Sequence, residues 1–220
     1  MDLYSFVLGN REIFKLIYAL FILIICVIIV FRTNRLFQLS LHQGIRYFRN
    51  AFFFYGLAFF SRYILDLFLG HHIVDPLFEF FIIVAGSFLL YSLLWKKIES
   101  EKGTHSSLFN SRILIFYFMA IIIALIDTIW STMYVMFFSQ IVLFLFASII
   151  SFYKFKNNEK RKKFPGFHFL AMILMFFAWI LNLLAPLLFS WNPIALINIY
   201  FFNAVFFLVF LFGAIKISGR

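Results

Sequence analysis

Ionisable residues stand inside a Phe-rich apolar stretch that runs from Tyr55 to Glu79. Arg62 and Asp66 interrupt this stretch, and the chain breaks at Gly70 before it becomes apolar again. Charged side chains at membrane depth cost about 2.5–3.5 kcal/mol each, so they usually face the interior of a helix bundle and have a partner there. Because residues four apart share a helical face, Arg62 and Asp66 are predicted to form an inward-facing pair.

Other polar residues are expected at the same depth as this pair. In the sixth apolar run, Trp179, Asn182 and Pro186 lie three and four residues apart, hence on one helical face. Pro186 cannot donate to the carbonyl of Asn182, which predicts a kink and a free acceptor. The predicted ligand-binding set is Arg62, Asp66, Glu79, Asp127, Asn182 and Asn198. The spacing leaves open whether Arg62 and Asp66 face a ligand or only hold each other as a structural clamp.

Metal binding and catalysis are both disfavoured by the residue types present. His71, His72, Asp75 and Glu79 are capable of binding a metal, but no second His or Cys group supplies the remaining ligands. Asp75-Pro76 is better interpreted as a helix start, with Asp75 as the N-cap and with the negative charge of Glu79 placed favourably in the helix dipole. The sequence contains no Ser-His-Asp set or metalloprotease motif. We therefore expect no metal, no cofactor and no enzymatic activity.

The composition is that of an all-α, polytopic membrane protein. Hydrophobic residues make up 65% of the 220 residues, Phe alone contributes 37, and only 13% are charged, against about 25% in soluble domains. This length holds about seven spans of roughly 20 residues and leaves no room for a soluble domain. The predicted helices cover 12–31, 50–69, 76–95, 112–129, 131–153, 167–189 and 194–215.

The basic residues are distributed unequally between the two ends of these helices. Of the 19 Lys and Arg residues, 16 fall on one side, in the segments 32–50, 96–112, 154–163 and 216–220. The positive-inside rule then predicts a cell-membrane protein with its N-terminus outside and its C-terminus cytoplasmic. The net charge of +10 indicates contact with anionic lipid of the bilayer at the inner loops rather than with nucleic acid.

Three connections between the predicted helices are distinctive. The segment Leu36–Arg49 is amphipathic and is expected to lie along the inner membrane interface. Residues 98–111 read as an exposed linker. The connection from Asp127 to Thr132 is so short that the fourth and fifth helices must be antiparallel neighbours.

Sliding the sequence against itself by 120 residues aligns the first helix with the fifth and the second with the sixth. Arg62 then coincides with Asn182, and Asp66 with Pro186. Two three-helix units share an orientation only if one helix joins them. The interpretation is a parallel repeat, with units at 12–95 and 131–215 joined by a linker helix at 112–129.

This three plus one plus three arrangement resembles the SWEET and PQ-loop transporters and the KDEL receptor. The segment Arg62-Tyr63-Ile64-Leu65-Asp66-Leu67-Phe68 also resembles Arg-Tyr-Leu-Asp-Leu-Phe at the lumenal end of that receptor's second helix. It departs by one inserted residue, which widens the Arg–Asp spacing from three to four. The resemblance implies parallel repeats with a binding site between the halves, near the middle of the membrane.

Three hypotheses for function follow. The first is a small-solute transporter or facilitator whose halves rock around an outward-facing polar pocket. The second is a receptor for a small ligand or peptide, which signals through its basic face. The third is a purely structural membrane subunit, with a protein partner or a second copy of itself, whose polar residues only specify helix packing. Solute uptake into proteoliposomes separates the first from the others.

Overall fold

The computed structural model describes residues 10–40, 43–98, 111–157, 163–189 and 193–218, and these contain helices and no strand. The helices are α2 (Arg11–Ser40), α3 (Gln43–Phe60), the π-helix η1 (Ser61–Leu65), α4 (Asp66–Leu69), α5 (His71–Ile98), α6 (Ser111–Trp130), α7 (Tyr134–Asn157), α8 (Lys163–Phe189) and α9 (Pro193–Ser218). The segments α3, η1 and α4 follow one another without a break and count as one span. Within the described residues, six helices are long and apolar enough to cross a membrane, and Ile199–Ile215 in α9 is a shorter apolar stretch.

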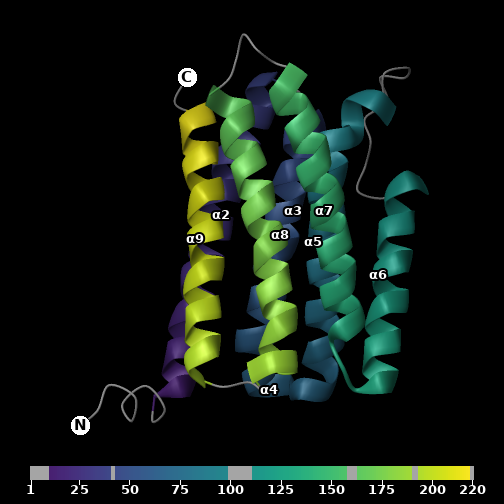
Figure 1. Cartoon of the computed structure of the whole chain (residues 1–220), viewed down its shortest axis with the longest axis vertical. Helices are drawn as coiled ribbons and strands as arrows, with labels where there is room; N and C mark the ends of the chain where they lie inside the picture. Colours follow the sequence, from purple (N-terminus) through teal and green to yellow (C-terminus); the bar gives the residue numbers. More distant parts are fainter. Residues whose placement is uncertain (1–9, 41–42, 99–110, 158–162, 190–192, 219–220) are drawn as a thin grey trace.

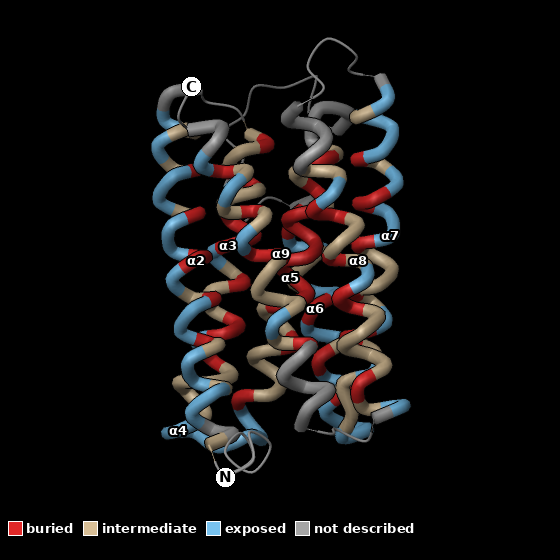
Figure 2. The backbone as a smooth tube through the Cα atoms, turned by 60° about the vertical axis from the view of Figure 1, so that its left-hand side comes forward, coloured by how far each residue is buried: buried red, intermediate tan, exposed pale blue. Residues whose placement is uncertain are grey.

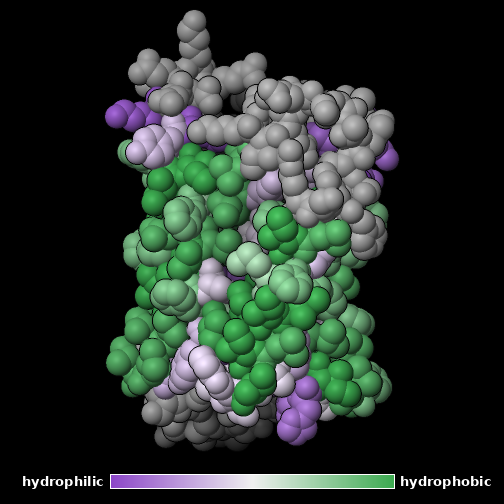
Figure 3. Space-filling view, turned by 90° about the vertical axis from the view of Figure 1, so that its right-hand side faces the viewer, coloured by the Kyte–Doolittle hydropathy of each residue, from purple (hydrophilic) through white to green (hydrophobic). Residues whose placement is uncertain are grey.

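The outer faces of the helices are as apolar as the faces that pack together. Phe118, Ile129 and Phe201 are 65%, 76% and 73% exposed. Hydrophobic side chains cover most of the face in Figure 3, and strongly hydrophilic ones lie toward its ends, while buried residues line the inner side of the bundle in Figure 2. A helix that is hydrophobic all round requires an apolar surrounding. The chain is therefore an all-α membrane protein, as its composition predicts.

Six of the spans form a closed ring, and α6 lies at one side of the bundle (Figure 1). Around the ring, the span α3–η1–α4 packs between α2 and α5, α5 packs against α7, and α8 packs between α7 and α9, which closes the ring on α2. The helix α6 packs mainly against α5 and more lightly against α7. The ring therefore encloses a central space to which α6 does not contribute.

Contacts between helix ends give the helix directions. Tyr18, early in α2, stacks on Tyr200, early in α9, so these helices are parallel. Lys154, late in α7, donates a hydrogen bond to the carbonyl of Leu93, late in α5, so these are parallel as well. Ser151 in α7 faces His168 at the start of α8, which makes that pair antiparallel.

The predicted interfacial segment Leu36–Arg49 is wrong, because α2 continues to Ser40 and α3 begins at Gln43. A 30-residue helix is about 45 Å long, which matches a bilayer with its headgroup layers. The guanidinium of Arg49 donates to Asn34 Oδ1 at 2.5 Å and lies 5.8 Å from the ring centre of Phe37. The amphipathic residues thus join the end of α2 to the start of α3.

The start of α5 also differs from the prediction. The helix begins at His71 rather than at Asp75, and Pro76 lies inside it. Pro76 is the sixth residue of α5, beyond the first turn, so it leaves the carbonyl of His72 without its intrahelical donor. The turn occurs at Gly70, whose φ of 76° lies in the left-handed region, which glycine adopts without steric cost. The consequence is that Asp75 projects from the second turn of α5 and is available as an ion-pair partner.

Helices α5 and α7 approach each other closely at Ala85-Gly86-Ser87. The side chain of Gln140 in α7 lies over Gly86, and its amide donates to the carbonyl of Ile82 at 3.3 Å. Both Ala85 and Gln140 are fully buried. Because small residues let helix backbones approach, this contact forms part of the seam between the first and second groups of three spans.

Candidate ligand-binding cavity

The ring encloses a cavity of about 130 Å³. All six ring spans contribute to it, whereas none of the described residues of α6 does. The lining residues are Tyr18, Tyr55, Phe59, Arg62, Tyr63, Phe78, Ile82, Met133, Phe137, Met175, Ala178, Trp179, Asn182, Ala185, Ile199, Tyr200, Asn203 and Phe207. They come from the early parts of α2, α5, α7 and α9 and the later parts of α3–η1 and α8, so the cavity occupies the half of the bundle in which α2 begins.

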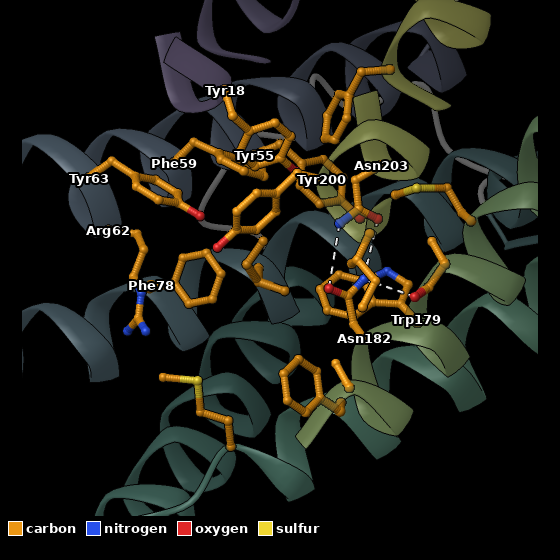
Figure 4. A pocket seen from close by; sticks show the side chains of 18 residues that line it. Tyr18, Tyr55, Phe59, Arg62, Tyr63, Phe78, Trp179, Asn182, Tyr200 and Asn203 are labelled. Atoms are coloured by element: carbon orange, nitrogen blue, oxygen red, sulfur yellow. Dashed lines mark hydrogen bonds between the residues drawn. The ribbon is translucent and has the colours of Figure 1, made fainter. Parts of the chain in front are cut away.

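Aromatic rings form half of the cavity wall (Figure 4). Tyr18 stacks on Tyr200 with ring centroids 4.6 Å apart, and its edge meets Phe59 at 5.8 Å. Phe59 in turn stacks on Tyr63 at 6.1 Å. Such pairs contribute about 0.5–1.5 kcal/mol each beyond the area they bury. These contacts hold the α2, α3 and α9 sides of the wall together.

Arg62 lines the cavity, but its partner is not the predicted one. Its guanidinium forms an ion pair with Asp75 on α5 instead of Asp66. The guanidinium carbon also lies 5.5 Å from the ring centre of Phe78, a cation–π contact. The side chains of Arg62 and Asp75 are 30% and 34% exposed. Solvent therefore reaches this ion pair at the edge of the cavity.

Asp66 does not line the cavity, and the predicted Arg62–Asp66 pair is wrong for a geometric reason. The turn at Gly70 folds α5 back along η1, which sets Asp75 beside Arg62 and His71 beside Asp66. Asp66 Oδ1 lies 2.7 Å from His71 Nδ1, and the His71 side chain is 75% exposed. Helical spacing alone did not reveal these partners across the turn.

Asn182 lines the cavity as predicted, and it pairs with Asn203 across from α8 to α9. Asn182 Nδ2 donates to Asn203 Oδ1 at 3.2 Å, and Asn203 Nδ2 donates to Asn182 Oδ1 at 3.4 Å. Asn182 Nδ2 also donates to the carbonyl of Ala178 at 2.8 Å. Both amide hydrogens of Asn182 are therefore used within the protein, as the dashed lines in Figure 4 show. The side chain of Asn198, another predicted member, lies outside the described residues.

Glu79 is placed beside the cavity rather than in its wall. Its side chain is only 2% exposed, and Oε2 has no hydrogen-bond partner among the described residues. Asp127 and Arg62 are both close enough to act on it electrostatically. Glu79 also lies one helical turn beyond Asp75, so α5 presents two carboxylates in succession toward the region of Arg62.

Asp127 has a structural role that the prediction of a ligand-binding residue missed. It is fully buried at the end of α6. Its Oδ1 accepts from Thr132 Oγ1 and from the Val135 amide, both at 3.1 Å, and its Oδ2 accepts from the Met136 amide at 2.7 Å. These amides belong to the first turn of α7, which has no other intrahelical acceptor for them. Asp127 therefore caps α7 across the short turn and does not line the cavity.

Sequence reasoning overlooked most of the aromatic wall, including Tyr18 and Tyr200, and it assigned no role to Asn203. The inward face of Arg62 also carries Tyr55 and Phe59 at helical spacing, which indicated part of this wall. In a chain with 37 Phe, the signal for the rest of the wall is lost among many apolar faces of the same kind. Among the described residues, no group of three His, Cys, Asp or Glu side chains is arranged to hold a metal ion.

The fold and the cavity define a polytopic α-helical membrane protein with an interhelical pocket lined by aromatic and amide side chains. Across 187 residues, the chain is 26% identical to an uncharacterised protein of Archaeoglobus fulgidus, with 76% of each chain covered. No family model matches the chain. No solved structure matches it either.

Proposed function

We propose that the protein is a small-solute transporter or facilitator whose substrate binds in the cavity at the centre of the ring. One observation carries this proposal: all six ring spans, three from each side of α6 in the sequence, contribute to one cavity with polar and aromatic walls. Sites formed between two groups of helices open and close when one group moves against the other. The groups meet at two seams, α5 with α7 and α2 with α9.

We also propose that the two groups of three spans form a parallel internal repeat. Three pairs of cavity-lining residues are separated by 120 positions, namely Tyr55 with Met175, Phe59 with Trp179, and Arg62 with Asn182. The parallel contacts of α2 with α9 and of α5 with α7 agree with two groups related by rotation about the membrane normal. In that arrangement, α2, α3 and α5 correspond to α7, α8 and α9, and α6 is the linker.

A receptor that binds a ligand without transporting it is the second candidate. The lining of the cavity is confined to one half of the bundle, so a ligand can bind there without passing to the other side. Such a protein would bind solute in the same cavity and show no flux. The transport assay below separates the two functions.

Filling the cavity is expected to abolish transport while the protein stays folded. Ala178 is buried in the wall of the cavity, so Ala178→Phe places a ring in a space of about 130 Å³. Proteoliposomes are shrunk osmotically by adding urea, glycerol, nicotinamide or nicotinate outside. The recovery of their volume as the solute enters is followed by light scattering. For at least one solute, the wild type should recover faster than empty liposomes, and Ala178→Phe should lose at least 90% of that excess rate.

The matched control is Leu187→Phe, on the same helix but 55% exposed. It should transport like the wild type, and all variants should elute as a single species from a sizing column. If proteoliposomes recover their volume no faster than empty liposomes with any solute of a wider panel, the transport proposal is wrong. If Ala178→Phe transports normally, solute does not pass through this cavity.

For orientation, we propose that the end of the bundle where α2 begins faces outward, because 16 of 19 basic residues lie toward the other end. In a Cys26→Ser background, a membrane-impermeant maleimide should label Ser190→Cys on intact cells and should label Ser106→Cys only after lysis. Labelling of Ser106→Cys on intact cells would reverse the orientation.

A further inference from the structure

The cavity wall offers hydrogen-bond donors and few free acceptors. Its polar side chains are four tyrosines, one tryptophan, one arginine and two asparagines, and no carboxylate, histidine, serine or threonine is among the lining residues that the structure describes. Tryptophan and arginine only donate. The two asparagines largely satisfy each other through their reciprocal hydrogen bonds. The tyrosine hydroxyls both donate and accept, so a bound molecule with an acceptor can pair with the tryptophan and with any tyrosine hydroxyl that is free.

Two of the polar atoms on lining residues have no partner in the protein. Tyr55 is 1% exposed and Trp179 is 8% exposed, and neither the Tyr55 hydroxyl nor Trp179 Nε1 has a hydrogen-bond partner among the described residues. A buried donor left unpaired costs about 1–3 kcal/mol, so each such group in a native protein calls for an explanation. Because both residues line the cavity, its contents are the available source of an acceptor.

The charges around the cavity favour an uncharged molecule. Arg62 is the single charged residue among the described lining residues, and its charge is balanced by Asp75. Glu79 lies within electrostatic range of Arg62 and is almost completely buried. This cluster has no excess positive charge to attract an anion. A cation would approach Arg62 without a carboxylate in the wall to bind it.

Size and shape of the wall limit the molecule further. A volume of about 130 Å³ is on the scale of cavities that hold one benzene-sized molecule. Aromatic faces form half of the lining and favour a flat or apolar partner. A carbonyl group on such a body would place an acceptor near donors while the rings contact its faces.

We propose that the cavity binds a small, uncharged, planar carbonyl compound, such as a carboxamide or a heterocyclic amide, through hydrogen bonds from Trp179 and Tyr55. This inference adds a ligand class to the proposed function, whose cavity it shares. Molecules of this class are polar enough at the amide to cross a bilayer slowly, so a carrier for them is physically reasonable.

Three isosteric probes of different charge test the proposal: benzamide (neutral), benzoate (anion) and benzamidinium (cation). Each is titrated calorimetrically into the full-length protein in nanodiscs, with empty nanodiscs subtracted. Benzamide should bind saturably and at least tenfold more tightly than the two ions. Trp179→Phe and Tyr55→Phe should each weaken benzamide binding by about three- to tenfold, because each removes one donor. Tyr55→Phe keeps the ring, whereas Trp179→Phe also replaces the indole by a smaller ring.

A purely structural role for these groups is excluded by a second readout. Since the Tyr55 hydroxyl has no hydrogen-bond partner among the described residues, Tyr55→Phe should leave the melting temperature of the unliganded protein unchanged or raised. Trp179→Phe also shrinks a buried ring, so a moderate fall in its melting temperature is expected and its donor role is judged by affinity. The control Trp130→Phe, at a residue 66% exposed at the end of α6, should alter neither affinity nor melting temperature.

Tighter binding of benzoate or benzamidinium than of benzamide would overturn the ligand class. Unchanged benzamide affinity in both variants, or a fall in the melting temperature of Tyr55→Phe, would overturn the role of the two donors. Binding of benzamide without any flux in the osmotic assay would reject transport and leave this inference standing. A solute flux that neither Trp179→Phe nor Tyr55→Phe changes would reject this inference and leave the transport proposal standing.

Discussion

Replacement of Asp127 by alanine is expected to lower the free energy of unfolding by about 3 kcal/mol. The carboxylate is fully buried and accepts three hydrogen bonds, two of them from backbone amides in the first turn of α7. Removing it leaves the Val135 and Met136 amides without their acceptor in a region that excludes water. It also removes a negative charge from a helix N-terminus, where such a charge is favourable.

Unfolding of the purified protein by SDS titration in mixed micelles measures this loss. Asp127→Asn retains one carbonyl oxygen and should lose roughly half as much as alanine. Asp66→Ala is the matched control, because Asp66 faces a histidine that is 75% exposed, and it should cost less than about 1 kcal/mol. A loss below 1 kcal/mol for Asp127→Ala would show that the cap contributes little to stability.

A methyl group at Gly86 is the second change with a large expected effect. A Cβ built at this glycine lies 2.5 Å from Gln140 Oε1 and 3.2 Å from Gln140 Cδ. Gln140 is fully buried and donates to the Ile82 carbonyl, so its side chain cannot move aside without losing that hydrogen bond. Gly86→Ala should therefore destabilise the protein by about 1–3 kcal/mol.

The double variant Gly86→Ala/Gln140→Ala identifies the cause. If the clash is the reason, the double variant should be more stable than the sum of the single effects by at least 1 kcal/mol, measured in the same SDS titration. Gly213→Ala is the control, since a Cβ there meets nothing within 4 Å, and it should be neutral or stabilising by up to about 1 kcal/mol because alanine is the better helix former. Additive effects would mean that α5 and α7 adjust to the methyl group by separating.

The fold class could be predicted from sequence because a bilayer imposes a length and an apolar composition on every span. The ends of the helices were harder. The prediction ended the first helix near Arg32, where the apolar run stops, whereas α2 continues to Ser40. A helix continues into the headgroup layer as long as its side chains find partners there, and the contact between Arg49 and Asn34 is a tertiary interaction that no local pattern encodes.

The candidate site could be predicted from the sequence only in part, because its contacts are also tertiary interactions. The free-energy cost of placing a polar or charged side chain at membrane depth directed attention to Arg62, Asn182 and the buried carboxylates. It did not distinguish a carboxylate that faces a cavity from one that accepts backbone amides, and both Glu79 and Asp127 are buried for reasons other than lining the wall. The ion-pair partner of Arg62 depends on the turn at Gly70, which places Asp75 rather than Asp66 beside it.

The π-helix at Ser61–Leu65 has a consequence for how this chain tolerates insertions and deletions. Each hydrogen bond of a π-turn spans one residue more than in an α-helix, so such a turn accommodates an extra residue without interrupting the helix. Deleting one residue there would convert the turn to regular helix and rotate one flank by about 100° relative to the other. We expect the span to survive such a deletion, while the side chains after the turn would face new directions relative to those of α3.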